Sequence, residues 1–305
     1  MAYRFRLSEA FDHGVRRVGL QQIDRAIADL ETLQDAELAV HGTRKGLKRI
    51  RALLRLARPA LEPAEYRHEN RCFRDIGRIL ARARDRHVLA KTLERLEEAT
   101  KGQSKLAFKA ALKQLAEQNE QAPNAVDERT IRRALAELKA ARKRFERMVI
   151  HSRCFETGFD GLKASYGQAV KTFAAASESG DTEDIHEWRK RVQHHFRHLM
   201  LMSEASPEVF GARIETARAL AASLGEDHDI AMVLAAVGDD GSLKVSAAHR
   251  RAIEEFVSGR RKVLWADAQA TGRTLFSDKP RTFREKVKRH WDGAQAAPAK
   301  VRSPA

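Results

Sequence analysis

Cysteine is scarce in this sequence. The 305 residues include two cysteines, Cys72 and Cys154, which do not form a CxxC pair. This count excludes a disulfide framework and a cysteine zinc site, and it predicts that both residues are buried as small apolar side chains. No segment has the roughly 18 consecutive apolar residues that cross a bilayer, and the N-terminal residues lack the apolar core of an export signal. We expect a cytoplasmic protein that makes no membrane contact.

Glycine and proline are also sparse, at 17 and 7 residues. Apolar residues recur at helical spacing over long stretches, and no run alternates in the manner of a β-strand. This pattern predicts an all-α fold of antiparallel helical bundles with short connections. Breaks between helices are predicted at 60–66, 119–128, 177–184, 203–209, 237–242 and 277–282. The small, proline-containing tail 293–305 is predicted to be disordered.

Basic residues outnumber acidic ones. The sequence has 57 lysines and arginines against 42 aspartates and glutamates, which leaves a formal net charge of +15. A protein with this charge attracts polyanions. The candidate partners are a nucleic acid, an anionic membrane surface and a phosphate polymer.

Residues 41–59, HGTRKGLKRIRALLRLARP, contain no acidic residue. On a helix, one side of this segment is cationic and the opposite side is apolar. The cationic stripe is His41, Arg44, Lys48, Arg51, Arg55 and Arg58. The apolar stripe is Leu47, Ile50, Leu54, Ala57 and Leu61. Repulsion along the first stripe costs a few tenths of a kcal/mol per adjacent pair, so we expect a bound anion to offset it. The alternative is an exposed solubilising face, although such faces usually mix both signs of charge.

Two short patterns repeat at nearly the same offset. His41-Gly-Thr-Arg-Lys recurs as His186-Glu-Trp-Arg-Lys after 145 residues, and Leu80 to Asp85 is echoed by Leu224 to Asp229 after 144 residues. This agreement predicts a duplicated unit of four or five helices. The predicted halves are residues 1–155 and 156–292. The second half carries a weaker basic stripe of His186, Arg189, Lys190, His194 and Arg197. A further stripe contains Arg71, Arg74, Arg78 and Arg82.

These motifs resemble the CHAD domain, a helical family named for its conserved histidines. The resemblance rests on HxxRKxxKRxR at 41–51, HxxRKRV at 186–192, the two L-x-x-x-x-D elements and the duplication, and it spans residues 5–290. It implies two helical bundles related by a pseudo-twofold axis, with a basic central groove or pore. It also implies non-catalytic binding of inorganic polyphosphate, in association with polyphosphate granules.

The resemblance assigns phosphate contacts to both motif copies and, near the start of each half, to Arg17 and Lys163. Gln193 stands where the family usually has lysine. Together with the basic stripes, the predicted polyphosphate-binding residues are Arg17, His41, Arg44, Lys45, Lys48, Arg49, Arg51, Arg55, Arg71, Arg74, Arg78, Arg82, Lys163, His186, Arg189, Lys190, His194 and Arg197. His41 and His186 are expected either to contact phosphate or to bond the backbone, and neighbouring cations favour their neutral form.

Two other functions remain open. The first is nucleic-acid binding, which is less favoured because aromatic residues are only 6% of the chain and Phe73 and Trp188 fall on packing sides. The second is a metal-dependent polyphosphate hydrolase or phosphotransferase. The sequence has no ExExK strand, phosphate-binding glycine loop or nucleophile set, so we expect no enzyme activity.

No metal or cofactor is predicted. His194 and His198 have the i, i+4 spacing of metal ligands, but the surrounding cations repel a metal ion and His195 is predicted to face the core. Asp85 and Asp229 are predicted to pair with arginines from neighbouring helices.

Overall fold

A computed structural model describes residues 3–32, 35–80, 82–120 and 128–297, without the side chains of 82–85 and 119–120. Within these ranges the chain forms eleven α-helices, two short 3-10 helices and no strand, which confirms the predicted all-helical fold. The α-helices are α1 (Phe11–Thr32), α2 (Ala36–Ala57), α3 (Pro63–Ile79), α4 (Arg82–Glu98), α5 (Gly102–Glu120), α6 (Glu128–Arg147), α7 (Phe155–Ser179), α8 (Thr182–Met202), α9 (Pro207–Val237), α10 (Ala247–Leu275) and α11 (Pro280–Ala296). The 3-10 helices are η1 (Arg58–Ala60) and η2 (Ser203–Ala205).

Local sequence signals set several helix ends. The Asp35 carboxylate caps α2 by accepting from the backbone N–H of the second and third residues of the helix. Gly180 ends α7 with φ of 65°, in the left-handed region that favours glycine. Pro63, Pro207 and Pro280 lie in the first turns of α3, α9 and α11, where the missing N–H costs no helical bond.

The helices pack around two hydrophobic cores. The larger core joins α1, α2, α3, α6, α7, α8 and α11 with the start of α9 and the end of α10. The smaller core joins α4 and α5 with the end of α9 and most of α10. Each core therefore combines helices from both sides of residue 155, and α9 and α10 run through both.

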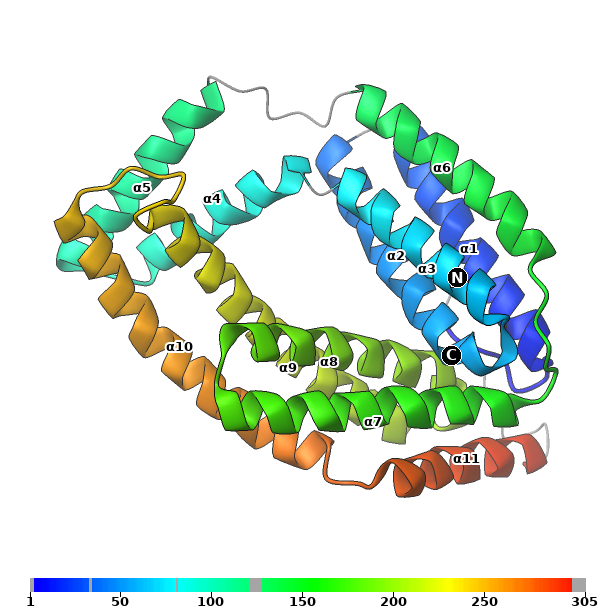
Figure 1. The fold of residues 1–305 in the computed structure, drawn as a ribbon. Helices are drawn as coiled ribbons and strands as arrows, with labels where there is room; N and C mark the ends of the chain where they lie inside the picture. The colour runs from blue at the N-terminus through cyan, green and yellow to red at the C-terminus, as the bar shows by residue number, and fades with distance from the viewer. Residues whose placement is uncertain (1–2, 33–34, 81, 121–127, 298–305) are drawn as a thin grey trace.

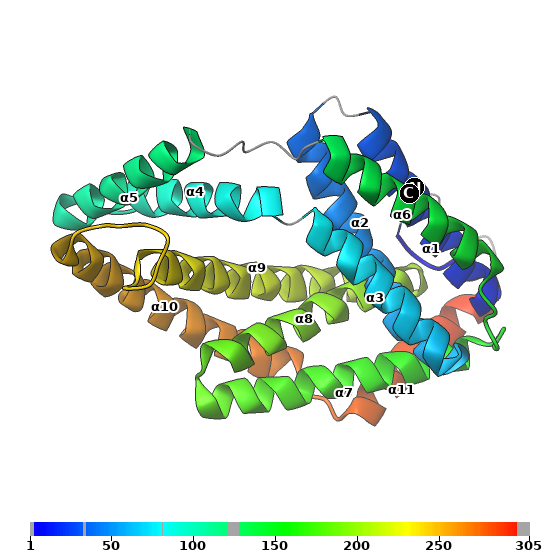
Figure 2. The same cartoon turned by 45° about the horizontal axis from the view of Figure 1, so that its top comes forward.

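The helices are laid out as an elongated frame (Figure 1). The α4–α5 pair lies at one end beside the loop that joins α9 to α10, and α1, α2, α3 and α6 lie at the other end. Figure 2 shows α9 and α10 extending from the α8 region to the α4–α5 pair. The α2 helix contacts α7 and α8, so this packing joins the two motif-bearing helices.

Aromatic rings tie the N-terminal segment to the C-terminal helix. The ring of Phe155 lies 5.4 Å from that of Phe5 and 4.3 Å from that of Trp291. The backbone N–H of Phe5 donates to the carbonyl of Leu201 at 2.8 Å. These contacts place the first residues of the chain against α7, α8 and α11.

The predicted disorder of 293–305 is wrong for residues 293–296, which form the last turn of α11. Trp291 is buried, and the side-chain amide of Gln295 donates to the carbonyl of Leu7 at 2.9 Å, so tertiary contacts order a segment of weak local signals. Residues 298–305 lie outside the described residues.

Two further expectations are corrected. Cys154 is exposed because it precedes the first turn of α7, and Cys72 is half-buried beside the guanidinium of Arg144. Among the described residues before 155 there are six α-helices rather than four or five, because α3 ends at Ile79 and a separate helix, α4, follows it.

A substitution at Gly161 tests how much the close contact between α7 and α2 contributes to stability. A Cβ at Gly161 would lie 1.9 Å from the carbonyl oxygen of Leu56 in the last turn of α2, and a backbone atom cannot rotate away as the end of a flexible side chain can. We expect Gly161→Ala to lower the free energy of unfolding by about 1–3 kcal/mol or more, measured by urea denaturation. The control is Gly259→Ala on the exposed face of α10, where nothing lies within 4 Å. It should gain up to about 1 kcal/mol from helix propensity. Equal effects would contradict this role of Gly161.

Candidate functional site

The α2 helix buries most of its circumference and leaves its cations at the remaining surface. Leu47, Ile50 and Leu54 of the predicted apolar stripe are at most 2% exposed. His41, Lys45 and Lys48 are exposed, and Arg44, Arg49, Arg51 and Arg55 are half-buried. The amphipathic pattern of residues 41–58 therefore positions the cations as the sequence indicates.

Arginines from three helices lie close together in a cluster that we name the basic band. Its members are Arg51 and Arg55 of α2, Arg74 and Arg78 of α3, and Arg191 of α8. Burial lowers the pKa of Arg51, and the charges of Arg55, Arg74 and Arg78 lower it further. Burial also lowers the pKa of Arg55, followed by the charges of Arg191 and Arg58. The band thus spans residues more than 100 positions apart in the sequence.

Lys48 of α2 reaches toward the second motif copy. Burial lowers the pKa of His228 on α9, and the charges of Arg189, Lys190 and Lys48 contribute. The ring of His228 lies 4.5 Å from that of His186, the first residue of the second motif. Burial and the charge of Lys190 lower the pKa of His186 to about 4, so this histidine is neutral at pH 7. The structure therefore brings the two motif copies to one region.

Arg44 and Arg189 occupy the same position in the two motifs and both turn toward the following helix. Arg44 Nη1 donates to the carbonyl of Gly77 on α3 at 2.6 Å. Arg189 lies over Gly225 on α9, where an added Cβ would lie 3.6 Å from its Nη2. The charge of Asp229 opposes the lowering of the Arg189 pKa by burial, which fits the predicted pairing of that aspartate. These two arginines connect helices as well as carrying charge.

A second basic cluster lies around Lys45 and Arg49. The charge of Arg49 is the largest cause of the lowered pKa of Lys45, and Arg218 of α9 and Arg25 of α1 add to it. Arg49 also lies over the ring of Tyr3, at 5.3 Å from its centroid. Sequence reasoning missed Arg25 and Arg218 because neither lies in a repeated motif. It also omitted Arg191 from the predicted site, although Arg191 follows the second Arg-Lys pair directly.

Two carboxylates near the basic band compensate part of its charge. Asp75 interacts with Arg74 and Arg78, at 2.9 and 3.5 Å. Glu187 lies 3.6 Å from Arg191. In the described part of the chain, no ion pair or hydrogen bond of Arg55 is found, and its Nε is buried without a hydrogen-bond acceptor.

Several predicted contacts are placed elsewhere. Arg197 is only 8% exposed, and it stacks on Phe196 and donates to the carbonyl of Gln193, so the predicted exposed stripe of α8 is wrong at this position. Arg17 is held by Glu9 and by the carbonyl of Arg4, and is not brought to the basic band.

The remaining predicted residues contribute less to the cluster. Arg71 and Lys163 are exposed on α3 and α7. Lys190 is exposed and lies 2.5 Å from Glu187. The side chains of Arg82 and Asp85 lie outside the described residues.

Two histidines of α8 lie in the interior, and a third, His194, is half-buried beside them. His195 and His198 are buried, and His198 Nε2 lies 2.9 Å from the carbonyl oxygen of Ala52 on α2. Burial lowers the pKa values of His194 and His195 well below the usual value, and that of His198 to about 4. His194 also lies in the field of Arg55, so the interior beneath the band contains neutral imidazoles. Among the described residues, no group of three or more histidines, cysteines or acidic residues could hold a metal ion.

The fold and the site define an all-helical protein with arginines and lysines gathered between distant helices. The family model of the CHAD domain matches residues 19–238, and the chain therefore belongs to the CHAD domain family. The crystal structure of the CHAD domain from the plant Ricinus communis is similar over 98% of this chain and 95% of that chain, with 18% sequence identity and a TM-score of 0.46. No curated protein matches. None of the described helices has the length and apolar character that crossing a membrane requires.

The buried His198 predicts a pH dependence of stability. Its pKa is about 4 in the folded protein and close to 6.5 in the unfolded chain, so the unfolded chain takes up the proton first as the pH falls. Its contribution is fully present above pH 6.5 and decreases toward pH 4, by roughly 3 kcal/mol in total.

We expect His198→Gln to reduce the loss of unfolding free energy between pH 6.5 and pH 4, measured by urea denaturation across this range. The same substitution at the exposed His13 is the matched control. An unchanged slope in the His198 variant would show that this histidine does not titrate as described.

Proposed function

We propose that the protein binds inorganic polyphosphate at the basic band and at the neighbouring Lys48, Lys190 and His228. The observation that supports this function is the lowered pKa of two arginines of α2. Burial is the main cause for both, the charge of Arg55 further lowers the pKa of Arg51, and the charge of Arg191 on α8 further lowers the pKa of Arg55. Such crowding opposes folding, and a bound anion reverses the penalty by supplying the missing negative charge. Membership of the CHAD domain family favours polyphosphate as that anion.

Polyphosphate fits this arrangement chemically. It is a flexible linear anion with one charge on each internal phosphate, and a row of guanidinium groups binds such a chain through charge-assisted, bidentate hydrogen bonds. Binding also releases counterions from the polymer, as it does when basic proteins bind the DNA backbone. The site then selects for charge density and requires no contact with a base.

Nucleic-acid binding is the first alternative. Base recognition on a single strand uses aromatic side chains as stacking surfaces. Phe73 and Trp188, which lie on the same helices as the band, are fully buried in the larger core. These two rings therefore cannot stack on bases, which favours the phosphate polymer.

We infer that the chain is a duplicated unit in which α2 corresponds to α8, and α3 with α4 corresponds to α9. Leu80 and Leu224 match at the offset of the two motifs, and Arg44 and Arg189 each reach the helix that follows their own. A pseudo-twofold relation would place the two motif helices across a shared basic groove.

The proposed role is non-catalytic and belongs at polyphosphate granules in the cytoplasm. A metal-dependent polyphosphate hydrolase or phosphotransferase is the second alternative. Release of orthophosphate from long polyphosphate with added Mg²⁺ or Mn²⁺ would contradict a purely binding role.

The triple variant Arg51→Gln, Arg55→Gln and Arg74→Gln tests the binding site. We expect its affinity for long polyphosphate to fall on the order of tenfold for each lost contact, because each removes a charge-assisted hydrogen bond. The slope of log affinity against log salt concentration should become shallower by about two, at roughly 0.7 per phosphate contact. Calorimetric titration over a range of salt concentrations measures both quantities.

A charge-matched control separates a site from general attraction. Lys109, Lys113 and Arg132 are exposed on α5 and α6, and their replacement by glutamine changes the net charge by the same amount. If this control loses as much affinity as the band variant, or if duplex DNA binds as tightly as polyphosphate, the proposed site is wrong.

A further inference from the structure

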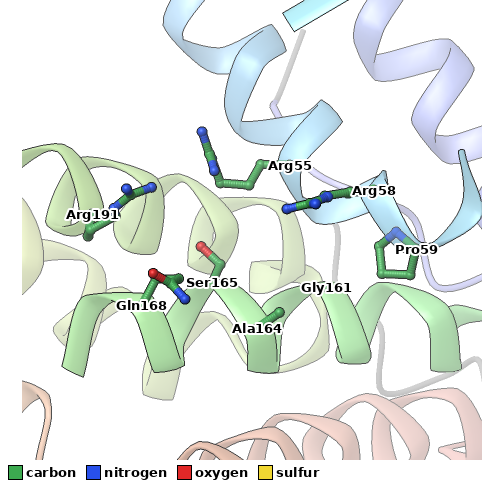
Figure 3. Close-up of a pocket in the computed structure, with 8 residues that line it drawn as sticks. All are labelled: Arg55, Arg58, Pro59, Gly161, Ala164, Ser165, Gln168 and Arg191. Atoms are coloured by element: carbon green, nitrogen blue, oxygen red, sulfur yellow. The ribbon is translucent and has the colours of Figure 1, made fainter. Parts of the chain in front are cut away.

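A pocket of about 340 Å³ opens where the end of α2 meets α7 and α8. Arg55, Arg58 and Arg191 surround it, and Ser165 and Gln168 of α7 lie along the opposite wall (Figure 3). Pro59, Gly161 and Ala164 complete the lining. The guanidinium groups of Arg58 and Arg191 extend toward the same space from opposite sides, as Figure 3 shows.

The charge of the pocket is positive, and only Arg191 among its arginines has a carboxylate partner in the described residues, Glu187 at 3.6 Å. Its eight lining residues, all in the described part of the chain, include three arginines and no acid. The Nε atoms of Arg55 and Arg191 are buried without an acceptor, and a buried donor without a partner is costly. Arg58 lies over the ring of Tyr66, at 5.2 Å from its centroid, which holds its position without neutralising it. An anion with several acceptor oxygens would satisfy these donors.

The pocket is closed at the contact between α2 and α7. Gly161 belongs to the lining, and its Cα lies so close to the carbonyl oxygen of Leu56 that even a methyl group does not fit. A polymer that enters the pocket therefore has no exit between these helices. The open side continues into the basic band, because Arg55 and Arg191 belong to both.

We propose that this pocket binds the terminal phosphate of a linear polyphosphate chain, while the basic band binds the internal phosphates. The inference rests on the proposed function and adds to it the part of the polymer that is recognised. A terminal phosphate has three free oxygens and a second negative charge near neutral pH, whereas an internal phosphate has one charge. Three guanidinium groups, the Ser165 hydroxyl and the Gln168 amide match this group in charge and in donors.

Two triphosphates with equal phosphate content test the proposal. Linear tripolyphosphate has terminal phosphates and cyclic trimetaphosphate has none, so we expect the wild-type protein to bind the linear form at least tenfold more tightly. Arg58→Gln, which changes the pocket and not the band, should weaken binding of the linear form about tenfold and change that of the cyclic form little. Arg191→Gln, which also removes a charge from the band, should weaken the linear form more than the cyclic form. Arg78→Gln, which removes one charge from the band outside the pocket, should affect both triphosphates alike. Circular dichroism and thermal unfolding check that each variant is folded, and the exposed Arg58 provides a second variant if Arg191→Gln is unstable.

The outcomes distinguish this inference from the proposed function. If Arg58→Gln and Arg191→Gln weaken both triphosphates equally, the pocket does not recognise a chain end, even when long polyphosphate binds with the expected salt dependence. Binding of orthophosphate as tight as that of tripolyphosphate would assign the pocket to free phosphate and would also overturn the inference. Failure of the proposed function would appear instead as long polyphosphate binding no more tightly than duplex DNA.

Discussion

The close packing of α2 against α7 and α8 is the contact on which the site depends. Gly161 allows the α7 backbone to approach the carbonyl of Leu56, and the His198 ring approaches the carbonyl of Ala52. Both contacts use backbone atoms in the last two turns of α2, so the helix has little freedom to move away. The cations of α2 must then lie beside those of α8, and the repulsion between them is built into the fold.

The interior between α2 and α8 contains neutral histidines and a buried arginine that, in the described part of the chain, has no carboxylate beside it. Burial keeps His194, His195 and His198 neutral, so they provide polar contacts without adding further positive charge. Arg197 is covered by the ring of Phe196 and bonded to a carbonyl group, which stabilises a guanidinium without a carboxylate. Because the neutral histidines and the contacts of Arg197 involve no acidic residue, they leave the positive field of the basic band at the surface in place.

Much of this structure could be predicted from local patterns, and the rest depends on tertiary contacts. The acid-free stripe of residues 41–58 predicts which side of α2 packs, because helical periodicity alone fixes that relation. The same periodicity placed Arg197 on the exposed side of α8, but α2 and the N-terminal segment cover that side in the fold. The helical turn at Gly293 could not be predicted from local sequence either, because the hydrogen bond from Gln295 to the N-terminal segment joins residues 288 positions apart. Arg25 and Arg218 lie near Lys45 and Arg49 only because α1 and α9 pack beside α2. No sequence motif predicts that packing.

The sharing of both cores between the two parts of the chain gives binding a wider consequence. A polyanion on the basic band, as proposed, would contact α2 and α3 from the first part and α8 from the second, and the larger core already joins these helices. The α9 helix runs from that core into the smaller one, so both cores share one continuous helix. A ligand that binds only the folded arrangement stabilises it in proportion to the logarithm of its concentration. Since the like charges proposed to bind the ligand also oppose folding in its absence, the proposal links affinity and stability through the same arginines.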